Sequence, residues 1–374
     1  MADAPSSDPN DGSGISVSGA VDIGYTNMNS TGLYVGSTKA LPLGSRVLDA
    51  PNARQDKNIN SLALNQVAVA ISRQPKEGFG AVLNLMGGQD SNALAAWGAG
   101  NSGGYAYDNH HNLDVTLAYV TYVTGALTAS AGKLLTLIGA EGLSNVSNTN
   151  YSHAILFGNP TPATHAGARL AYALDDQVTL IAGVNNGWDT VPATTDRKTI
   201  ELGFSAKPDK MLSVIGSYYT GYELADGYTS LQSTVGRRQI IDLVATINLT
   251  DQFSLVLNFD DASQGNAMLA QGGRGTARFD GLAIYLNYQL NDQWRASLRG
   301  EAVSDPNGYT AGFVGKTGQT SKEATLTLTY MPVKSFEIRG EVRQDRSNQA
   351  IFLQTNGLGK NEQTSFGLEL IYKF

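Results

Sequence analysis

The sequence contains no cysteine, so a disulfide framework, a thiolate metal site and haem attachment through Cys-x-x-Cys-His are excluded. Charged residues are also few. They make up 16% of the chain, below the ~25% that is usual in soluble domains. No apolar run approaches the ~18 residues of a transmembrane helix. The net charge is −7 and no basic patch stands out, so nucleic acid is not an expected partner.

A domain boundary and an apolar leader are missing as well. A soluble chain of 374 residues would be expected to form two or three domains, yet no composition shift, Pro-rich linker or charge run divides this one. Met1 is followed directly by Ala-Asp-Ala-Pro, without the apolar region of a signal peptide. We interpret Met1 as an added start codon on a mature secreted chain, residues 1–14 as a flexible tail, and residues 15–374 as one domain. A cytosolic protein is the alternative.

Alternation of apolar and polar residues with a period of two is the main positive signal. It is clear in residues 15–25 and recurs as far as the C-terminus. The pattern predicts sixteen strands, joined alternately by short turns and longer loops. They span about residues 15–25, 59–73, 78–88, 111–123, 126–137, 163–174, 177–186, 197–207, 210–222, 237–249, 252–261, 278–290, 292–303, 320–331, 335–346 and 362–374.

The even strand number and the alternating connections are typical of a transmembrane β-barrel. Predicted strands of about 10–13 residues suit a tilted membrane strand of ~9–11, whereas soluble sandwiches favour ~5–6. We therefore expect an all-β fold: a transmembrane antiparallel up-and-down β-barrel of about 16 strands, with short periplasmic turns and long outer loops. Its location would be the bacterial outer membrane, surrounded by lipid and lipopolysaccharide.

The positions of charged residues predict which face of the barrel is wet. In strand 335–346, Phe336, Ile338 and Val342 should face lipid, and the alternating charged residues should face the lumen. An Arg in lipid costs ~2–4 kcal/mol near the midplane, so these charges are expected to line a water-filled channel. The solvated face of a soluble sheet is the alternative. The parity fails near residues 62–64 and 133–135, where a β-bulge would explain it.

A long irregular segment, residues 138–162, is expected to fold into the lumen and narrow it. Structureless loops of this length are uncommon in compact domains unless they are functional. The segment should face an Arg-rich wall, and the two rows of charges would set the ion selectivity. A lid packed outside the lumen is the alternative. The pore-lining and constriction candidates are Glu141, His153, Arg169, Asp242, Asp260, Arg295, Arg299, Glu301, Glu337, Arg339, Glu341 and Arg343.

Catalytic and metal-binding motifs are scarce. The sequence has no P-loop, no Gly-x-Ser-x-Gly elbow and no His-Glu-x-x-His. His110 and His111 are adjacent, so in a strand they would point to opposite faces and could not bind one metal together. The pair Asp260-Asp261 could bind a cation weakly, although we favour an ordinary structural role. We predict no catalytic residue, no metal site and no cofactor.

Near the C-terminus, apolar residues alternate from Phe366 to the terminal Phe374. This pattern resembles the sorting signal of bacterial outer-membrane barrels, which implies the barrel-assembly machinery as a partner through Phe374.

Five motifs within about residues 130–190 resemble the OmpL-like β-barrel porins of Gram-negative bacteria. They are Ala131-Gly-Lys-Leu-Leu-Thr-Leu-Ile-Gly-Ala-Glu-Gly142, Asn150-Tyr-Ser152, Phe157-Gly158, Pro162-Ala-Thr-His-Ala-Gly167 and Val184-Asn-Asn-Gly-Trp-Asp189. The resemblance implies an outer-membrane porin without catalytic residues and does not name a solute.

The function we expect is passive diffusion of small hydrophilic solutes or ions through a water-filled barrel, which could be a homo-oligomer. Barrels of 16–18 strands leave an aqueous channel. The first alternative is a sheath or scaffold for a periplasmic partner such as an electron-transfer cytochrome. An outer-membrane enzyme would need a Ser/His/Asp cluster at the rim, and the sequence does not indicate one.

Overall fold

The computed structural model describes residues 14–30, 61–94, 113–158, 161–191, 195–225, 234–269, 272–309, 318–354 and 356–374. The predicted flexible tail, except Gly14, lies outside the described residues, and so do His110 and His111. Within the described ranges, no helix is both long and apolar enough to cross a membrane.

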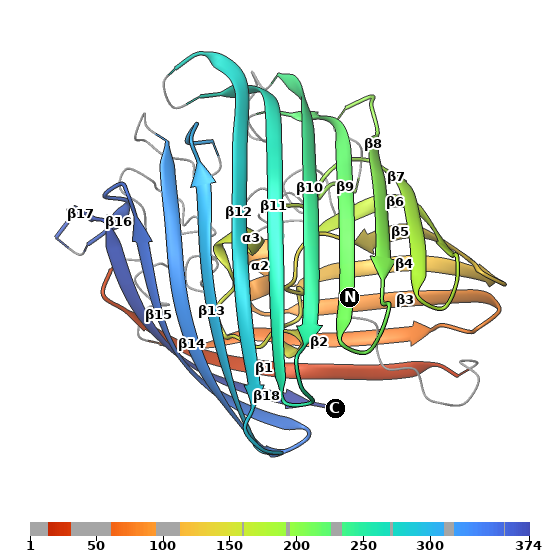
Figure 1. Cartoon of the computed structure of the whole chain (residues 1–374), viewed down its shortest axis with the longest axis horizontal. Coiled ribbons are helices and arrows are strands. Elements are labelled where there is room, and N and C mark those ends of the chain that lie inside the picture. The colour runs from red at the N-terminus through yellow and green to blue at the C-terminus, as the bar shows by residue number, and fades with distance from the viewer. Residues whose placement is uncertain are drawn as a thin grey trace.

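Sixteen strands of the described chain form one closed barrel in which every neighbouring pair is antiparallel. The first and last barrel strands pair with each other, which leaves the sheet without an edge. Figure 1 shows this closure as red β1 beside blue β18. The barrel strands are β1 (Ser16–Met28), β2 (Ser61–Arg73), β3 (Gly78–Gly87), β4 (Leu113–Thr124), β5 (Leu127–Leu135), β6 (Thr164–Ala173), β7 (Val178–Asn185), β8 (Thr199–Ala206), β9 (Leu212–Leu224), β10 (Val235–Asn248), β11 (Phe253–Met268), β12 (Arg274–Gln289), β13 (Trp294–Asp305), β14 (Gln319–Val333), β15 (Phe336–Ser347) and β18 (Glu362–Lys373).

Each predicted strand corresponds to one barrel strand, so the expected strand number and antiparallel topology are confirmed. The largest difference lies at the tip of the β11–β12 hairpin. β11 continues to Met268 and β12 starts at Arg274, whereas the sequence pattern predicts an end near 261 and a start near 278. The residues of this tip, Ser263-Gln-Gly-Asn, are polar on both faces, so hydrophobic periodicity cannot detect them.

Small elements outside the barrel sheet were not predicted. They are the helices α2 (Gln89–Leu94) and α3 (Ile155–Gly158), the 3-10 turn η2 (Asn145–Ser147), and the strands β16 (Phe352–Leu353) and β17 (Gly359–Lys360), which pair with each other. Each of these elements is too short for a repeating pattern of apolar and polar residues to be recognised in the sequence.

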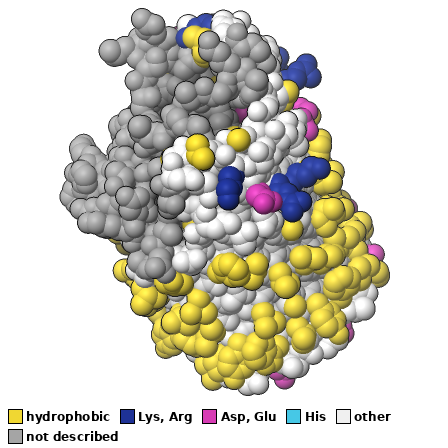
Figure 2. All heavy atoms as spheres, turned by 90° about the vertical axis from the view of Figure 1, so that its left-hand side faces the viewer, with side chains coloured by type: hydrophobic (Ala, Val, Ile, Leu, Met, Phe, Trp, Pro, Cys, Tyr) yellow, Lys and Arg dark blue, Asp and Glu magenta, His cyan; other side chains and the backbone are white. Residues whose placement is uncertain are grey.

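The two faces of the strands differ as the parity predicts. Outward-facing Leu326, Leu328, Val342, Phe366 and Leu368 are 45–55% exposed, while the residues between them on the same strands are largely buried. Figure 2 shows hydrophobic side chains forming a belt over the lower part of one face, with charged side chains above it. An apolar belt of this kind is the lipid-facing surface of a membrane barrel.

A β-bulge explains the failed parity near residues 62–64. Asp22 of β1 pairs with Gln66 and the next residue, Ile23, pairs with Leu64, so Asn65 is the extra residue. Asn65 and Gln66 are consequently both buried.

No such shift occurs near residues 133–135, where β5 and β6 pair in unbroken register, so a bulge in β5 is wrong. The irregularity lies in the neighbouring strand, β4, where Thr116 is skipped in the pairing with β3. In β5 itself the backbone of Gly132 has φ +138, and a Cβ there would lie 2.2 Å from the Ala118 carbonyl oxygen. Only glycine fits this position.

Candidate functional site

The segment between β5 and β6, residues 136–163, connects to inward-facing side chains around much of the barrel. We call it the β5–β6 segment; it contains η2 and α3 and is described except for residues 159 and 160. Its first part contacts β9, β10 and β11. The Leu137 N–H donates to the Tyr219 hydroxyl (3.0 Å), and the Ala140 N–H donates to Asn258 Oδ1 (2.9 Å).

Glu141 is the most connected side chain of the segment. Its carboxylate accepts from Arg299 Nη1 (2.8 Å), from the Tyr285 hydroxyl (3.0 Å) and from the Ala154 N–H (3.1 Å), and it pairs with His153 Nδ1 (2.7 Å). Burial raises the pKa of Glu141, but the Arg299 guanidinium and His153 outweigh burial and hold that pKa at about 2. Glu141 is therefore ionised at any ordinary pH, and His153 Nδ1 acts as a donor.

Carboxylates of the barrel wall bind the backbone of the segment. Glu341 of β15 accepts from the consecutive N–H groups of Tyr151 (2.7 Å) and Ser152 (3.0 Å). Glu301 of β13 accepts in the same way from Ile155 and from Leu156 (3.0 Å) at the start of α3. Each of these two carboxylates satisfies two donors that no helix or sheet satisfies, so wall and segment form one hydrogen-bonded unit.

Three arginines of the wall bind the carbonyl groups of the segment. Arg299 donates to Ser152 O (2.6 Å), Arg343 donates to His153 O (2.6 Å), and Arg339 donates to Asn145 O (3.1 Å). All three also form ion pairs with wall carboxylates, and their exposed fraction is 0%. The segment therefore covers them, so these guanidiniums lie between segment and wall.

The remaining pore-lining candidates from the sequence lie either next to the contact between the β5–β6 segment and the barrel wall or elsewhere on the inner face. Asp242 accepts from the Gly139 N–H (3.3 Å), and Asp260 lies opposite Asp242 on the next strand. Arg169 binds Glu201 and Leu135 O (2.8 Å), at the end of β5 where the segment begins. Arg295 and Glu337 form an ion pair with each other (3.5 Å). Asp260 and Asp261 face opposite sides of β11, so they cannot share a cation.

Sequence reasoning missed the contact of Asn145 with the first strands. Its side-chain amide donates to Asp22 of β1 and to Asp90 of α2 (3.0 Å), and its N–H donates to Gln66 of β2 (3.2 Å). Strand parity could have placed Asp22 on the inner face. Nothing in the sequence indicates that Asn145 reaches it.

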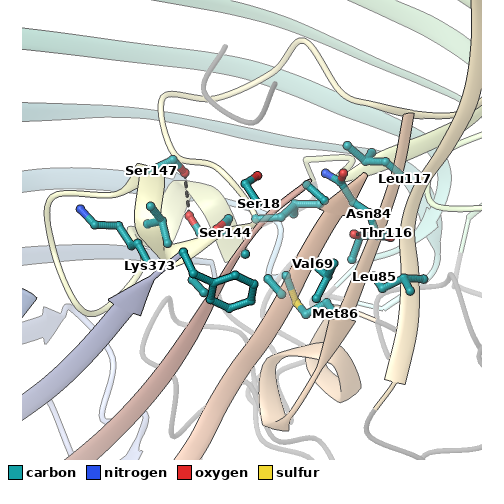
Figure 3. A pocket seen from close by; sticks show the side chains of 17 residues that line it. Ser18, Val69, Asn84, Leu85, Met86, Thr116, Leu117, Ser144, Ser147 and Lys373 are labelled. Carbon is teal, nitrogen blue, oxygen red and sulfur yellow. Dashed lines mark hydrogen bonds between the residues drawn. The ribbon is translucent and has the colours of Figure 1, made fainter. Parts of the chain in front are cut away.

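The β5–β6 segment leaves a cavity on each side. One, of about 300 Å³, lies against β1–β4 and is shown in Figure 3 with Ser144 and Ser147 of the segment on one side and Asn84 and Thr116 on the other. The other, of about 410 Å³, is lined by the segment and by residues of β4–β12. Both are bounded by the segment and the inner face of the barrel.

Buried charge is strongly unbalanced among the described residues. Fifteen Asp and Glu side chains are buried, against three Arg and no Lys. Six of these carboxylates form ion pairs with Arg or Lys. The buried carboxylates nevertheless outnumber the buried bases, and because burying negative charge is costly, such an excess favours cations nearby. Within the same residues, no group of three His, Cys, Asp or Glu side chains is arranged to hold a metal ion.

The chain is similar to known families and solved structures. Residues 14–374 match the family described as "Putative beta-barrel porin-2, OmpL-like". A comparison with curated proteins gives no match. Among solved structures, the chain is similar to the outer membrane channel DcaP of Acinetobacter baumannii, with 12% identity, a TM-score of 0.61 and coverage of 96% of this chain and 97% of that chain.

Two further structures show the same likeness in fold. The trimer form of OmpT, an outer membrane protein of Vibrio cholerae, is 10% identical with a TM-score of 0.60; 96% of this chain and 99% of that chain are covered. The anion-selective porin from Comamonas acidovorans is 11% identical with a TM-score of 0.59, again covering 96% and 99%.

Proposed function

The chain belongs to the OmpL-like family of β-barrel porins, and on that premise we propose that it is a cation-selective porin whose channel is narrowed by the β5–β6 segment. As a porin of the bacterial outer membrane, it allows passive diffusion of small hydrophilic solutes. Family and fold indicate a channel rather than an enzyme.

The constriction is supported by the hydrogen bonds between the segment and opposite parts of the barrel. Leu137 and Ala140 bind β9 and β11, while Tyr151 and Ser152 bind β15. A segment that binds both sides must reduce the cross-section available to solutes. The two cavities beside it are the spaces through which solutes would pass.

Cation selectivity is supported by the excess of buried carboxylates, and this is the observation that carries the proposal. The three buried arginines are each held in an ion pair, so they add no free positive charge to the lumen. Charged side chains that line a pore set which ions pass, and carboxylates favour cations. The screening length of ~8 Å at physiological salt confines the effect to a narrow passage.

A planar bilayer measurement tests this function. In a gradient of KCl, the reversal potential of the purified porin should have the sign of K⁺ permeation. A reversal potential near zero or of the opposite sign would contradict the selectivity. Absence of any open conductance would contradict the channel itself and favour a closed or plugged barrel.

A homo-oligomer is the second part of the proposal. The solved OmpT trimer form shares this fold, and the apolar outer belt of the present barrel offers a surface for neighbouring copies. The mass of the particle in detergent, corrected for bound detergent, distinguishes one chain from three. The alternative of a sheath around a cytochrome has no support, because the β5–β6 segment binds both sides of the space that a partner would need.

A further inference from the structure

Two carboxylates face each other on the inner wall of the barrel. Asp242 of β10 and Asp260 of β11 are direct partners in the strand register, and each is 1% exposed. Opposite residues of antiparallel strands have Cβ atoms ~4.5–5.5 Å apart, where like charges are destabilising. Among the described residues neither carboxylate forms an ion pair, although the neighbouring Glu141 and Glu201 do.

Three oxygen atoms in this row have no hydrogen-bond partner among the described residues. Asn258 Nδ2 donates to Asp242 Oδ2 (2.7 Å), which leaves Asp242 Oδ1 unpaired. Asp260 Oδ2 and the hydroxyl of Ser217, which lies opposite Asp242 on β9, are also buried and unpaired. Buried polar atoms are nearly always satisfied, so two carboxylate oxygens and one hydroxyl oxygen without an ordinary hydrogen bond, on three consecutive strands, point to a donor that binds there.

A cavity reaches one member of this row, Asp260. Asp260 and Asn258 line the cavity of about 410 Å³, which is within the ~300–1,000 Å³ of small-molecule sites. The other charged residues of its lining, Glu141 and Arg169, are neutralised by Arg299 and Glu201. Asp260 is therefore the acidic side chain of this lining that no ion pair neutralises.

Most of the remaining lining is apolar. The β5–β6 segment contributes Leu137, Ile138, Leu156 and Phe157, and the wall contributes Ile215. Such a surface gains nothing from a hydrated inorganic ion, but it would bury an apolar group.

We propose that Asp242, Asp260 and the Ser217 hydroxyl bind the ammonium group of a primary amine whose apolar body occupies the cavity. An ammonium group carries three N–H donors, which equals the number of unpaired oxygens, and its charge offsets the carboxylate pair. The porin would then bind and pass small organic ammonium ions in preference to neutral analogues. This assignment rests on the proposed cation-selective channel.

The test uses the full-length porin in a planar bilayer with K⁺ as the current carrier. We expect 2-phenylethylammonium to reduce the K⁺ current saturably, and neutral 2-phenylethanol, which has the same apolar body, to have no such effect. Asp260→Asn and Asp242→Asn should each raise the half-blocking amine concentration about tenfold or more, because each removes a charge-assisted hydrogen bond. Asp261→Asn is the matched control: the adjacent residue is exposed on the opposite face of β11, so this variant should behave as the wild type.

The outcomes separate this inference from the proposed function. Equal block by 2-phenylethanol would overturn the ammonium site, and this comparison needs only the wild-type protein. Equal half-blocking concentrations in the wild type and both Asn variants would overturn the assignment to these residues. A K⁺-selective reversal potential without any block by the amine would leave the porin function standing and reject the site, whereas loss of K⁺ selectivity in the wild type would reject the function on which the site rests.

Discussion

The carboxylate of Glu141 accepts a hydrogen bond from the guanidinium of Arg299 at 2.8 Å, although the two residues are 158 positions apart in the chain. The same guanidinium donates to Glu323 of the neighbouring strand at 2.6 Å. Arg299 thus joins the β5–β6 segment to the barrel wall, and the stability of this junction determines how firmly the lumen is narrowed.

Replacing Glu141 by Ala should loosen the segment. The change removes one partner of a buried ion pair, which typically costs ~3–5 kcal/mol, and it also frees His153 and the Ala154 N–H. Single-channel recordings should show higher and noisier conductance than the wild type. Glu362→Ala is the control, because Glu362 and Arg346 form an exposed pair worth little. Identical traces for Glu141→Ala and the wild type would show that the segment does not limit the current.

Deleting residues 143–158 should raise the conductance more than any single substitution. The deletion removes η2, α3 and the backbone groups that bind Glu301 and Glu341. We expect an increase of about twofold or more, toward the open channel of a sixteen-strand barrel. Heat-modifiable migration in gel electrophoresis checks that the barrel still folds. A folded deletion variant with unchanged conductance would place the limiting passage elsewhere.

The stability of the segment should fall as the pH rises through neutrality, because of Asp189. Oδ1 of this residue accepts from the N–H groups of Ala163 (2.8 Å) and Thr164 (2.9 Å), where the segment joins β6. Burial raises the pKa of Asp189 from 3.8 to about 7, although these two N–H groups, Lys133 and Arg238 oppose the rise. The folded protein therefore holds this proton more tightly than the unfolded chain does. The resulting stabilisation is complete below the ordinary pKa and is lost as the pH passes 7.

Thermal unfolding at pH 5 and pH 9 measures this effect. Asp189→Asn should remove part of the wild-type difference. Between pH 5 and a pKa of about 7 this contribution spans ~2 pH units, which at ~1.4 kcal/mol per unit amounts to at most about 3 kcal/mol. Asp209→Asn is the matched control, because Asp209 Oδ1 also accepts from two N–H groups but in an exposed turn. The role of Asp189 is refuted if Asp189→Asn and Asp209→Asn leave the same pH dependence.

Removing Tyr372 through Phe374 should impair assembly. Phe374 exchanges two backbone hydrogen bonds with Gly19 (2.8 and 3.0 Å), and Tyr372 pairs with Val21, so the deletion removes part of the closing seam. Phe374→Ala keeps the backbone bonds and alters only the side chain. If Phe374 is also read by the assembly machinery, this variant should refold in detergent but accumulate unfolded in cells. Normal folding of the three-residue truncation in both settings would contradict the prediction.

The strands could be predicted from the sequence because each one faces lipid on one side and the lumen on the other. The parity that places Val342 outside also places Glu341 and Arg343 inside, and the structure has them so. The prediction of strands from alternation fails in two situations. One is a strand whose two faces are both polar, as at the β11–β12 tip, and the other is an inserted residue, such as Asn65 in β2. A bulge changes the register without changing the composition, so periodicity alone cannot locate it.

The site could be predicted only in part, for a similar reason. Parity brings Arg299, Glu301 and Glu341 to one face, and the length of the β5–β6 segment marks it as unusual. From the sequence, the charged residues of the segment are expected to face those of the barrel wall across a water-filled passage. In the structure, Glu141 of the segment and Arg299 of the wall are in direct contact. That contact depends on the path of the segment, which is fixed by distant partners such as Asn145 with Asp22. Pairings over more than a hundred residues leave no local trace in the sequence.

The binding of segment N–H groups by Glu301 and Glu341 has a consequence for the order of folding. These acceptors lie 145 to 190 residues further along the chain than the donors they satisfy. The segment therefore cannot acquire its final conformation until β13 and β15, which carry Glu301 and Glu341, have joined the sheet. We expect hydrogen exchange during refolding to protect the amides of Tyr151, Ser152 and Leu156 after those of β13 and β15, so that the lumen is narrowed only once this part of its wall exists.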